Sequence, residues 1–492
     1  MISRLDCYKS CWEKNSRQGI LIFVAFVLLF TSFSVTVAAS SNHYSEINIQ
    51  FQSTDQTLLN GSLLIPEVPG PHPVVILIHG AGWHDREDYR SEAEIFVKSG
   101  IAAFIYDKRT VGYSADGIGE QSRSYALLAD DVLAAVDILR SREELDPKLI
   151  GLWGLSEGSS VAPLAAVQSN DVAFVITVSA SGVPPAQQTS WELENKYREQ
   201  GITASSFIHS MTRTGIRFLV SSDLFAEATY DHVPPLEKMQ QPLLAIWGNN
   251  DRTTPPVENY QIMRSALEHG GNVYVTFQFI PEANHDLRLS TNGFINSEQF
   301  APGYVEAMVS WIQDIVDGNG AGINVIGNMP EQSYTSFDGI TESFWYDSAW
   351  SHLAMMIILS TTFFSFFGMA LIRFRRVKVI STRSRLRWYA GAIAVTGTAS
   401  VLGFFGYFGY IMMTSEPGLI ILGSPLSWLV LQLLSIVTIV LTVMLAVMLV
   451  VSRRKAQSST DRFERIRLGS QLIGGILFIP WALYWKILLP LV

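Results

Sequence analysis

The chain has 492 residues, of which 48% are hydrophobic and 16% are charged. This composition is too apolar for an ordinary soluble protein, and the net charge of −9 argues against a nucleic-acid partner. The two cysteines, Cys7 and Cys11, precede the first apolar block. The rest of the chain therefore has no disulfide framework, and two cysteines at this spacing are a weak indication of a metal site.

The first segment, residues 1–40, predicts that the domain after it is exported. Residues 1–19 carry more basic than acidic side chains, and Ile20 to Val37 form a continuous apolar run. Two interpretations stay open. The run is either a signal peptide with a small-residue cleavage site at Val37-Ala38-Ala39, or an uncleaved signal anchor, because it nearly spans a bilayer. Both leave the basic flank in the cytoplasm and the next domain outside it.

Strand-like and helix-like segments alternate from Tyr44 to about Val316. The first two strand-like segments predict a hairpin, at Glu46–Phe51 and Thr57–Ile65. Six short apolar segments predict parallel strands buried on both faces: Pro73–Ile78, Ile101–Tyr106, Leu149–Trp153, Val172–Val178, Leu243–Trp247 and Val273–Phe279. Helices are expected at Ser124–Leu139, Ser159–Gln168 and Tyr304–Ile315. The pattern predicts an open, mostly parallel α/β sheet.

An insertion at about 179–241 has no strand character and predicts a helical cap. We expect this cap to cover the carboxyl edge of the sheet, where α/β proteins bind ligands. Five apolar residues of the cap would either present apolar surface at the pocket mouth or pack the cap onto the sheet: Trp191, Phe207, Phe218, Leu219 and Phe225.

The stretch Gly154-Leu155-Ser156-Glu157-Gly158 lies between a predicted strand and a predicted helix. This is the context of a G-x-S-x-G nucleophile elbow, in which a strained turn exposes the serine hydroxyl. Glycines at both flanks avoid collisions with the neighbouring strand and helix. Ser156 is therefore the candidate nucleophile.

A nucleophilic serine needs an imidazole base, an acid that orients the base, and amide donors for the oxyanion. His285 and Asp251 each follow a predicted strand, so both fall at the same sheet edge as Ser156. They are the candidate base and acid, and three further carboxylates remain as alternatives for the acid: Asp223, Asp231 and Asp286.

The oxyanion hole is assigned to the backbone amides of Ala81 and Glu157, with Gly82 as the rival for Ala81. Ala81 lies in the glycine-rich turn after the third predicted strand. His79 and His84 have no third ligand at a suitable spacing, so no metal is expected, and no cofactor either.

Five motifs occur in order along the chain: His79-Gly-Ala-Gly82 with Asp85-Arg86, Tyr106-Asp-Lys-Arg-Thr-Val-Gly-Tyr-Ser114, Gly154-Leu-Ser-Glu-Gly158, Gly248-Asn-Asn-Asp251 and Asn284-His285. On these motifs, residues from about 45 to 316 resemble an α/β-hydrolase-fold serine hydrolase. The resemblance is to exported esterases of the dienelactone-hydrolase and prolyl-oligopeptidase-like group. It implies hydrolysis of an ester, thioester or amide through an acyl-enzyme.

The second motif departs from the family pattern, because Thr110 stands where such esterases usually have glycine. This change puts the shape of that loop in doubt. We expect Asp107 and Arg109 to form a structural ion pair that braces the loop.

Residues 317–345 are rich in glycine, asparagine and serine and predict a linker, and 346–492 predict an all-α transmembrane region. Its four apolar spans are each long enough to cross a bilayer: Trp350–Ile372, Tyr389–Met413, Trp428–Val451 and Gln471–Leu491. The loops after the first and third spans are rich in arginine and lysine, whereas the loop between them has only Glu416. The positive-inside rule then places the hydrolase domain outside the cytoplasm.

The sequence thus predicts a membrane-anchored, extracytoplasmic serine hydrolase that acts on a small-molecule or lipid-like acyl substrate. A peptidase of the same fold is the alternative enzyme, and it is disfavoured because no acidic pair for a substrate amino terminus is evident. A non-catalytic envelope sensor or binding protein is the alternative from another class. The helical region is expected to anchor or assemble the protein rather than transport a solute.

Overall fold

The computed structural model describes residues 44–109, 124–319, 322–332, 334–340, 344–376, 384–454 and 462–488. These residues belong to one compact unit that begins at Tyr44. Three predictions lie wholly or partly outside the described residues: the export segment 1–40, positions 110–114 of the second motif, and much of the two basic loops.

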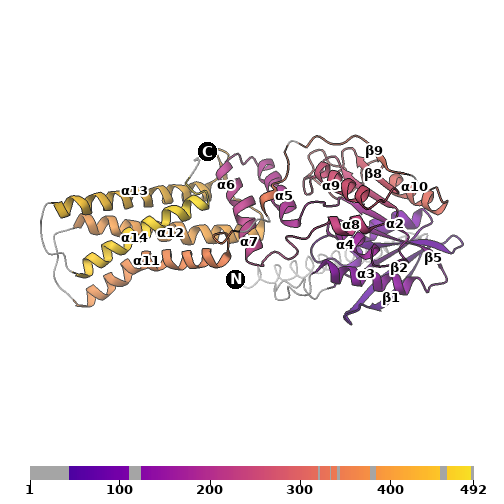
Figure 1. The fold of residues 1–492 in the computed structure, drawn as a ribbon, viewed down its shortest axis with the longest axis horizontal. Coiled ribbons are helices and arrows are strands. Elements are labelled where there is room, and N and C mark those ends of the chain that lie inside the picture. The colour runs from indigo at the N-terminus through magenta and orange to yellow at the C-terminus, as the bar shows by residue number, and fades with distance from the viewer. Residues whose placement is uncertain are drawn as a thin grey trace, which may run out of the picture. The chain divides into compact units, whose positions relative to one another are not determined.

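A nine-stranded sheet forms the centre of the α/β domain, in the order β1-β2-β4-β3-β5-β6-β7-β8-β9 (Figure 1). The strands are β1 Tyr44–Gln52, β2 Leu58–Pro66, β3 His72–Ile78, β4 Ala102–Tyr106, β5 Leu145–Leu155, β6 Phe174–Val178, β7 Leu243–Gly248, β8 Val275–Ile280 and β9 Asn324–Ile326. The β1–β2 and β2–β4 pairs are antiparallel, and every other pair is parallel. The predicted hairpin and the six predicted parallel strands are therefore confirmed.

Helices cover both faces of the sheet, which explains why its central strands are apolar throughout. On one face, α3 Tyr125–Leu139, α4 Glu157–Ala166, α8 Val233–Lys238 and α9 Pro256–His269 bury one hydrophobic core. On the other face, α2 Arg90–Lys98 and α10 Tyr304–Val316 bury a second core. This three-layer arrangement brings the carboxyl ends of β3, β5, β7 and β8 to one edge.

The segment predicted as a linker holds a ninth strand and makes ordered contacts with the α/β domain. Strand β9 pairs in parallel with β8. The Ser336 amide donates to Glu258 Oε2 at 2.8 Å, and Gln187 Nε2 donates to Ser336 Oγ at 2.6 Å. A strand of three residues leaves no periodic pattern, so composition alone indicates a linker here.

The C-terminal region contains α11 Ala349–Arg376, α12 Ser384–Thr414, α13 Leu426–Arg454 and α14 Arg462–Tyr484, drawn in orange to yellow in Figure 1. Each of these 4 helices is long and apolar enough to cross a membrane. The fourth helix lies earlier in the chain than the predicted span at Gln471–Leu491. Its charged first turn is accommodated because Glu464 Oε1 accepts from Arg387 Nε of α12 at 2.7 Å.

The cap consists of α5 Pro185–Glu199, α6 Ser205–His209, a π-helical turn at Ser210–Thr214 and α7 Gly215–Ser221. Phe225 lines a cavity at the sheet edge, as one expectation has it, whereas Phe207, Phe218 and Leu219 pack neither on the sheet nor at that cavity. Instead they share a hydrophobic core with the C-terminal helices. The ring centroids of Phe207 and Trp428 lie 5.6 Å apart, and those of Phe218 and Phe408 lie 5.8 Å apart.

A polar contact accompanies this packing. Ser206 Oγ of α6 accepts from Trp428 Nε1 at 3.1 Å and from Gln432 Nε2 at 3.3 Å, both on α13. All three side chains are buried. The cap is therefore joined to the C-terminal helices by specific contacts. The sequence shows that these cap residues are apolar, but not which element will bury them.

Candidate active site

Ser156 lies in a sharp turn between β5 and α4, with φ 53° and ψ −112°. A positive φ is strained for a non-glycine residue and is typical of a functional turn. The flanking glycines make this turn possible. A Cβ at Gly154 would lie 2.2 Å from the Gly158 carbonyl oxygen, and one at Gly158 would lie 2.3 Å from the Ile78 carbonyl oxygen.

The Ser156 turn opens into a cavity of about 390 Å³ at the carboxyl edge of the sheet. His285, Ala81 and Glu157 line the same cavity. Its remaining wall is formed by the following residues of the α/β domain and the cap: Gly80, His84, Tyr89, Tyr125, Leu155, Ser160, Pro185, Gln188, Thr189, Glu192, Phe225, Ala226, Thr253 and Asp286. The structure thus gathers four of the five predicted site residues around one space.

Asp251, the fifth predicted residue, lies behind His285. It follows β7, and His285 follows β8, so the two loops meet at the sheet edge. His285 Nδ1 lies 2.9 Å from Asp251 Oδ2. The Asp251 carboxylate also accepts from the amide of Thr253 at 2.8 Å and the hydroxyl of Thr254 at 2.7 Å. These bonds fix the carboxylate, and the carboxylate in turn fixes the imidazole through Nδ1. The other ring nitrogen, Nε2, is then the one that remains to act as a base.

The ionisation of this pair follows from burial and mutual attraction. Burial opposes the charged form of His285 and by itself would lower the pKa of the ring. The charge and the hydrogen bond of the Asp251 carboxylate outweigh burial and raise the pKa of His285 to about 9. Burial also opposes the charged form of Asp251, yet His285 and Thr254 hold the pKa of Asp251 below its usual value. Asp251 is therefore ionised at neutral pH.

The rival carboxylates have other positions. Asp231 is exposed just before α8 and accepts from the Val233 amide at 3.0 Å. Asp223 is exposed in a turn with φ 54°. Asp286 lines the cavity, where its carboxylate lies 3.4 Å from Asn296 Nδ2. Of the four candidates, Asp251 is the one that contacts the His285 ring.

The predicted oxyanion-hole segment is fixed at several points. The Gly80 amide donates to Tyr89 Oη at 2.7 Å, and the Ala81 carbonyl oxygen lies 3.1 Å from His84 Nε2. Gly82, the rival of Ala81, has φ +103°, a conformation that glycine adopts without strain. Ala81 lines the cavity together with Glu157, the first residue of α4.

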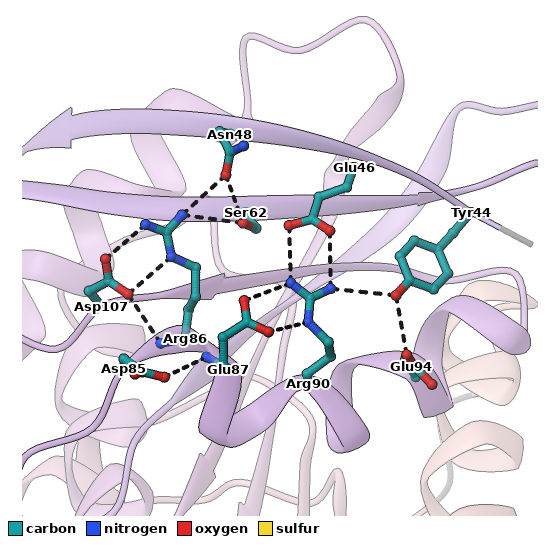
Figure 2. Close-up of polar contacts among 10 residues, drawn as sticks. All are labelled: Tyr44, Glu46, Asn48, Ser62, Asp85, Arg86, Glu87, Arg90, Glu94 and Asp107. Carbon is teal, nitrogen blue, oxygen red and sulfur yellow. Dashed lines mark hydrogen bonds and ion pairs between the residues drawn. The ribbon is translucent and has the colours of Figure 1, made fainter. Parts of the chain in front are cut away.

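The expected ion pair between Asp107 and Arg109 is wrong. Figure 2 shows that Asp107 instead binds Arg86, whose Nη2 lies 2.8 Å from Asp107 Oδ2. Arg109 binds Asp131 on α3, where the Nε–Oδ2 distance is 2.7 Å, and Asp55 in the β1–β2 turn at 2.9 Å. Each side chain has an oppositely charged partner on another element, and these partners take the place of the predicted pair.

The Arg86 contacts belong to a wider polar network beside the site. Arg86 Nη1 also donates to Asn48 and Ser62, on β1 and β2. In Figure 2, Arg90 lies between the carboxylates of Glu46 and Glu87, at 3.1 Å and 2.5 Å respectively. The network attaches the loop after β3, which carries Ala81, to the antiparallel edge of the sheet.

Sequence reasoning missed Lys108, the residue between Asp107 and Arg109. Its ammonium group donates to the Gly80 carbonyl oxygen and to Glu157 Oε2, the latter at 2.6 Å. The motif that contains Lys108 was a signal for the fold, but nothing in the spacing indicates that the lysine points inward. Sequence reasoning also missed Glu192 of the cap, which lines the cavity.

The two histidines near Ala81 are accounted for by other contacts. His84 Nδ1 lies 3.0 Å from Asp88 Oδ2. His79 is buried, and its ring lies edge-on to Tyr89 and Tyr106. Within the part of the chain that the structure describes, no group of three or more His, Cys, Asp or Glu residues could hold a metal ion.

The α/β domain is similar to several proteins that are named as hydrolases. Residues 69–213 match the family described as "Serine aminopeptidase, S33". A "Thiohydrolase aneE" of Aspergillus aculeatus is 33% identical over 135 residues, 27% of this chain and 41% of that protein. An "Esterase EstD" of Thermotoga maritima is 28% identical over 157 residues, 30% of this chain and 36% of that protein. The chain thus spans less than half the length of these curated relatives.

A solved esterase structure from Pyrococcus furiosus covers 57% of this chain and 93% of its own, with a TM-score of 0.39 and 18% identity. The fold itself is given by the family match over residues 69–213 and by the observed strand order. The chain therefore contains a domain with the α/β-hydrolase fold that matches the S33 family, followed by a helical region with four apolar helices.

Proposed function

We propose that this protein is a membrane-anchored serine hydrolase that cleaves carboxylic ester bonds, or the related thioesters and amides, outside the cytoplasm. One observation carries the proposal. Ser156, in a strained turn, shares a cavity with His285, whose Nδ1 lies 2.9 Å from the buried Asp251 carboxylate. A nucleophile, a base and an acid that orients the base are the parts that acyl transfer to serine requires.

In the proposed mechanism, Ser156 Oγ attacks the substrate carbonyl while His285 Nε2 takes the hydroxyl proton. Asp251 holds the ring and stabilises the imidazolium that forms. The amides of Ala81 and Glu157 donate to the oxyanion of the tetrahedral intermediate, which collapses to an acyl-enzyme as His285 protonates the leaving group. Water then attacks the acyl-enzyme, with His285 as the base again.

The location is supported by the four apolar helices and by the charge of their loops. Arginine and lysine are concentrated in the segments between the first and second helices and between the third and fourth, whereas 415–425 contains Glu416 and no basic residue. Under the positive-inside rule this asymmetry puts the α/β domain on the extracytoplasmic side. The apolar run at Ile20 to Val37 supports the same orientation.

A second candidate is hydrolysis of a substrate that carries an amino group, as in an aminopeptidase. Glu192 and Asp286 both line the cavity, so carboxylates that the sequence did not bring together lie around one space. A buried or half-buried carboxylate favours a cationic group on the substrate. The family description and this pair of side chains are the reasons to keep a peptidase in view.

The test combines an activity probe with a substrate panel. A fluorophosphonate should label the purified full-length chain at Ser156, because only an activated serine reacts. The panel compares p-nitrophenyl esters of graded chain length with aminoacyl anilides. Preference for the esters supports the esterase, and preference for the anilides supports the peptidase. Absence of labelling and of turnover on both series would favour the non-catalytic alternative.

A further inference from the structure

We propose that Lys108 is a positioning residue that joins and polarises the two halves of the oxyanion hole. The inference rests on the proposed function, because it concerns the amides of Ala81 and Glu157. Lys108 follows β4, whereas Ala81 follows β3 and Glu157 begins α4. The sheet holds β3 and β5 in register as far as the Ile78–Gly154 pair. The ammonium group bridges the two turns beyond that pair.

Two contacts of Lys108 reach the predicted hole, one to the residue before Ala81 and one to Glu157 itself. Its Nζ donates to the carbonyl oxygen of Gly80, the residue before Ala81. The same Nζ lies 2.6 Å from Oε2 of Glu157, the residue after Ser156. The Lys108 and Glu157 side chains are 3% and 7% exposed, so this is a buried ion pair and water screens it little.

The contact with Gly80 acts on the Ala81 amide directly. The carbonyl of Gly80 and the N–H of Ala81 belong to one planar peptide unit. A cation that donates to the carbonyl oxygen fixes the plane and therefore the direction of the N–H. It also polarises the peptide, which strengthens the hydrogen bond that the N–H donates at the other end. A fixed and polarised donor is what electrostatic stabilisation of an oxyanion needs.

The neighbours of Lys108 explain why it points inward. Asp107 is held by Arg86, and Arg109 is held by Asp131 and Asp55. The two flanking side chains are thus anchored to other elements, and the residue between them faces the site. Each residue of the segment 107–109 thus contacts a different part of the domain, and Lys108 is the one that contacts the predicted oxyanion hole.

Stability of the fold does not by itself explain why the chain has this ion pair. Replacing a buried ion pair with neutral groups often leaves the stability of a protein unchanged or raises it. Removing one partner is different, because it leaves a buried charge unpaired. The informative variant is therefore the double substitution Lys108→Met with Glu157→Gln. It removes both charges of this pair and keeps the Glu157 backbone amide.

The experiment measures kcat and KM on the best p-nitrophenyl ester, together with the melting temperature, for the full-length protein. We expect the double variant to keep a melting temperature close to wild type while kcat falls by about 100-fold, the lower end for loss of one oxyanion donor. KM should change less than threefold, because the hole acts on the transition state rather than on the bound substrate. Lys108→Arg, which retains a cation, should recover part of the loss.

Affinity for a tetrahedral transition-state analogue, a trifluoromethyl ketone of the same acyl group, should fall in parallel with kcat. Arg264→Met is the control, since it also breaks a charged contact, with Glu268 at 2.7 Å on α9, but does not contact the loop that carries Ala81. A folded double variant with kcat within threefold of wild type would overturn the inference. If that variant does not fold, the double substitution Lys108→Gln with Glu157→Gln, which also removes both charges, replaces it. A large loss of kcat then supports the proposal, and an unchanged kcat overturns it. A wild-type protein that hydrolyses no substrate and takes no fluorophosphonate would instead refute the proposed function.

Discussion

At the scale of single residues, the proposed mechanism gives Ser156 the strongest individual role. Replacing it with alanine should remove hydrolysis and leave the fold intact. The expected loss in kcat is about 10⁴ to 10⁶, because the nucleophile and its partners act as a unit. Turnover of the best ester is the measurement, with Ser169→Ala beyond the far end of α4 as control. More than a few per cent of residual activity would rule out Ser156 as the nucleophile.

The choice among the carboxylates is also decided at this scale. Asp251→Asn should lower kcat by about 10⁴, because an amide that donates to His285 Nδ1 favours the wrong tautomer. Asp286→Asn is the matched control on the residue next to His285 and should cost far less. Both variants are assayed on the same ester with the protein shown to be folded. A larger loss for Asp286→Asn would transfer the orienting role to that residue.

The pH profile follows from the raised pKa of His285. Burial opposes the charged ring, but Asp251 and the further negative charges of Asp286 and Glu192 favour it. The base must be neutral to accept the serine proton, so kcat/KM should rise with pH through the pKa of the free enzyme. The acidic limb should therefore lie above 6.5, near 9. In Asp251→Asn the acidic limb should move to lower pH, which can be measured as the pH dependence of the rate of fluorophosphonate labelling. An acidic limb at the same pH as in the wild type would contradict this assignment.

At the scale of elements, the strand-turn-helix unit from β5 to α4 depends on Gly154. A Cβ there would meet backbone atoms of Gly158 and Ser159 at 2.2 to 2.8 Å, and backbone cannot rotate away as a side chain can. Gly154→Ala should therefore lower the free energy of unfolding by about 3 kcal/mol or more. Gly322→Ala is the control, since a Cβ added there would have no neighbour within 4 Å. Denaturant unfolding of both variants checks the difference, and equal stabilities would refute the packing argument.

The elements also show how far the sequence could lead. The six central strands were predictable because burial on both faces leaves an unbroken apolar run. The Ser156 turn was predictable because glycines and serine occur at a spacing that few other structures require. Strand β9 was not predictable, since three residues carry no period. The pairing of Asp107 and Arg109 was predicted wrongly, because the sequence does not show which distant charged residues, here Arg86 and Asp131, lie against them in the fold.

At the scale of the whole molecule, the cap contacts both the cavity and the C-terminal helices. Its helix α5 contributes Pro185, Gln188, Thr189 and Glu192 to the cavity. Its helices α6 and α7 pack on α12, α13 and the segment after α14, through Phe207 and Phe218. The apolar residues of the cap were visible in the sequence. Their destination was not, because hydrophobicity is non-directional and does not select a partner.

The central claim is that an activated serine lies outside the cytoplasm on a chain held in a membrane. A charged, membrane-impermeant fluorophosphonate added to intact cells or spheroplasts tests both halves of that claim together. We predict labelling of the wild-type chain on intact cells, none of Ser156→Ala, and no further gain when the membrane is opened. Labelling only after the membrane is opened would contradict the orientation, and no labelling under either condition would contradict the serine hydrolase itself.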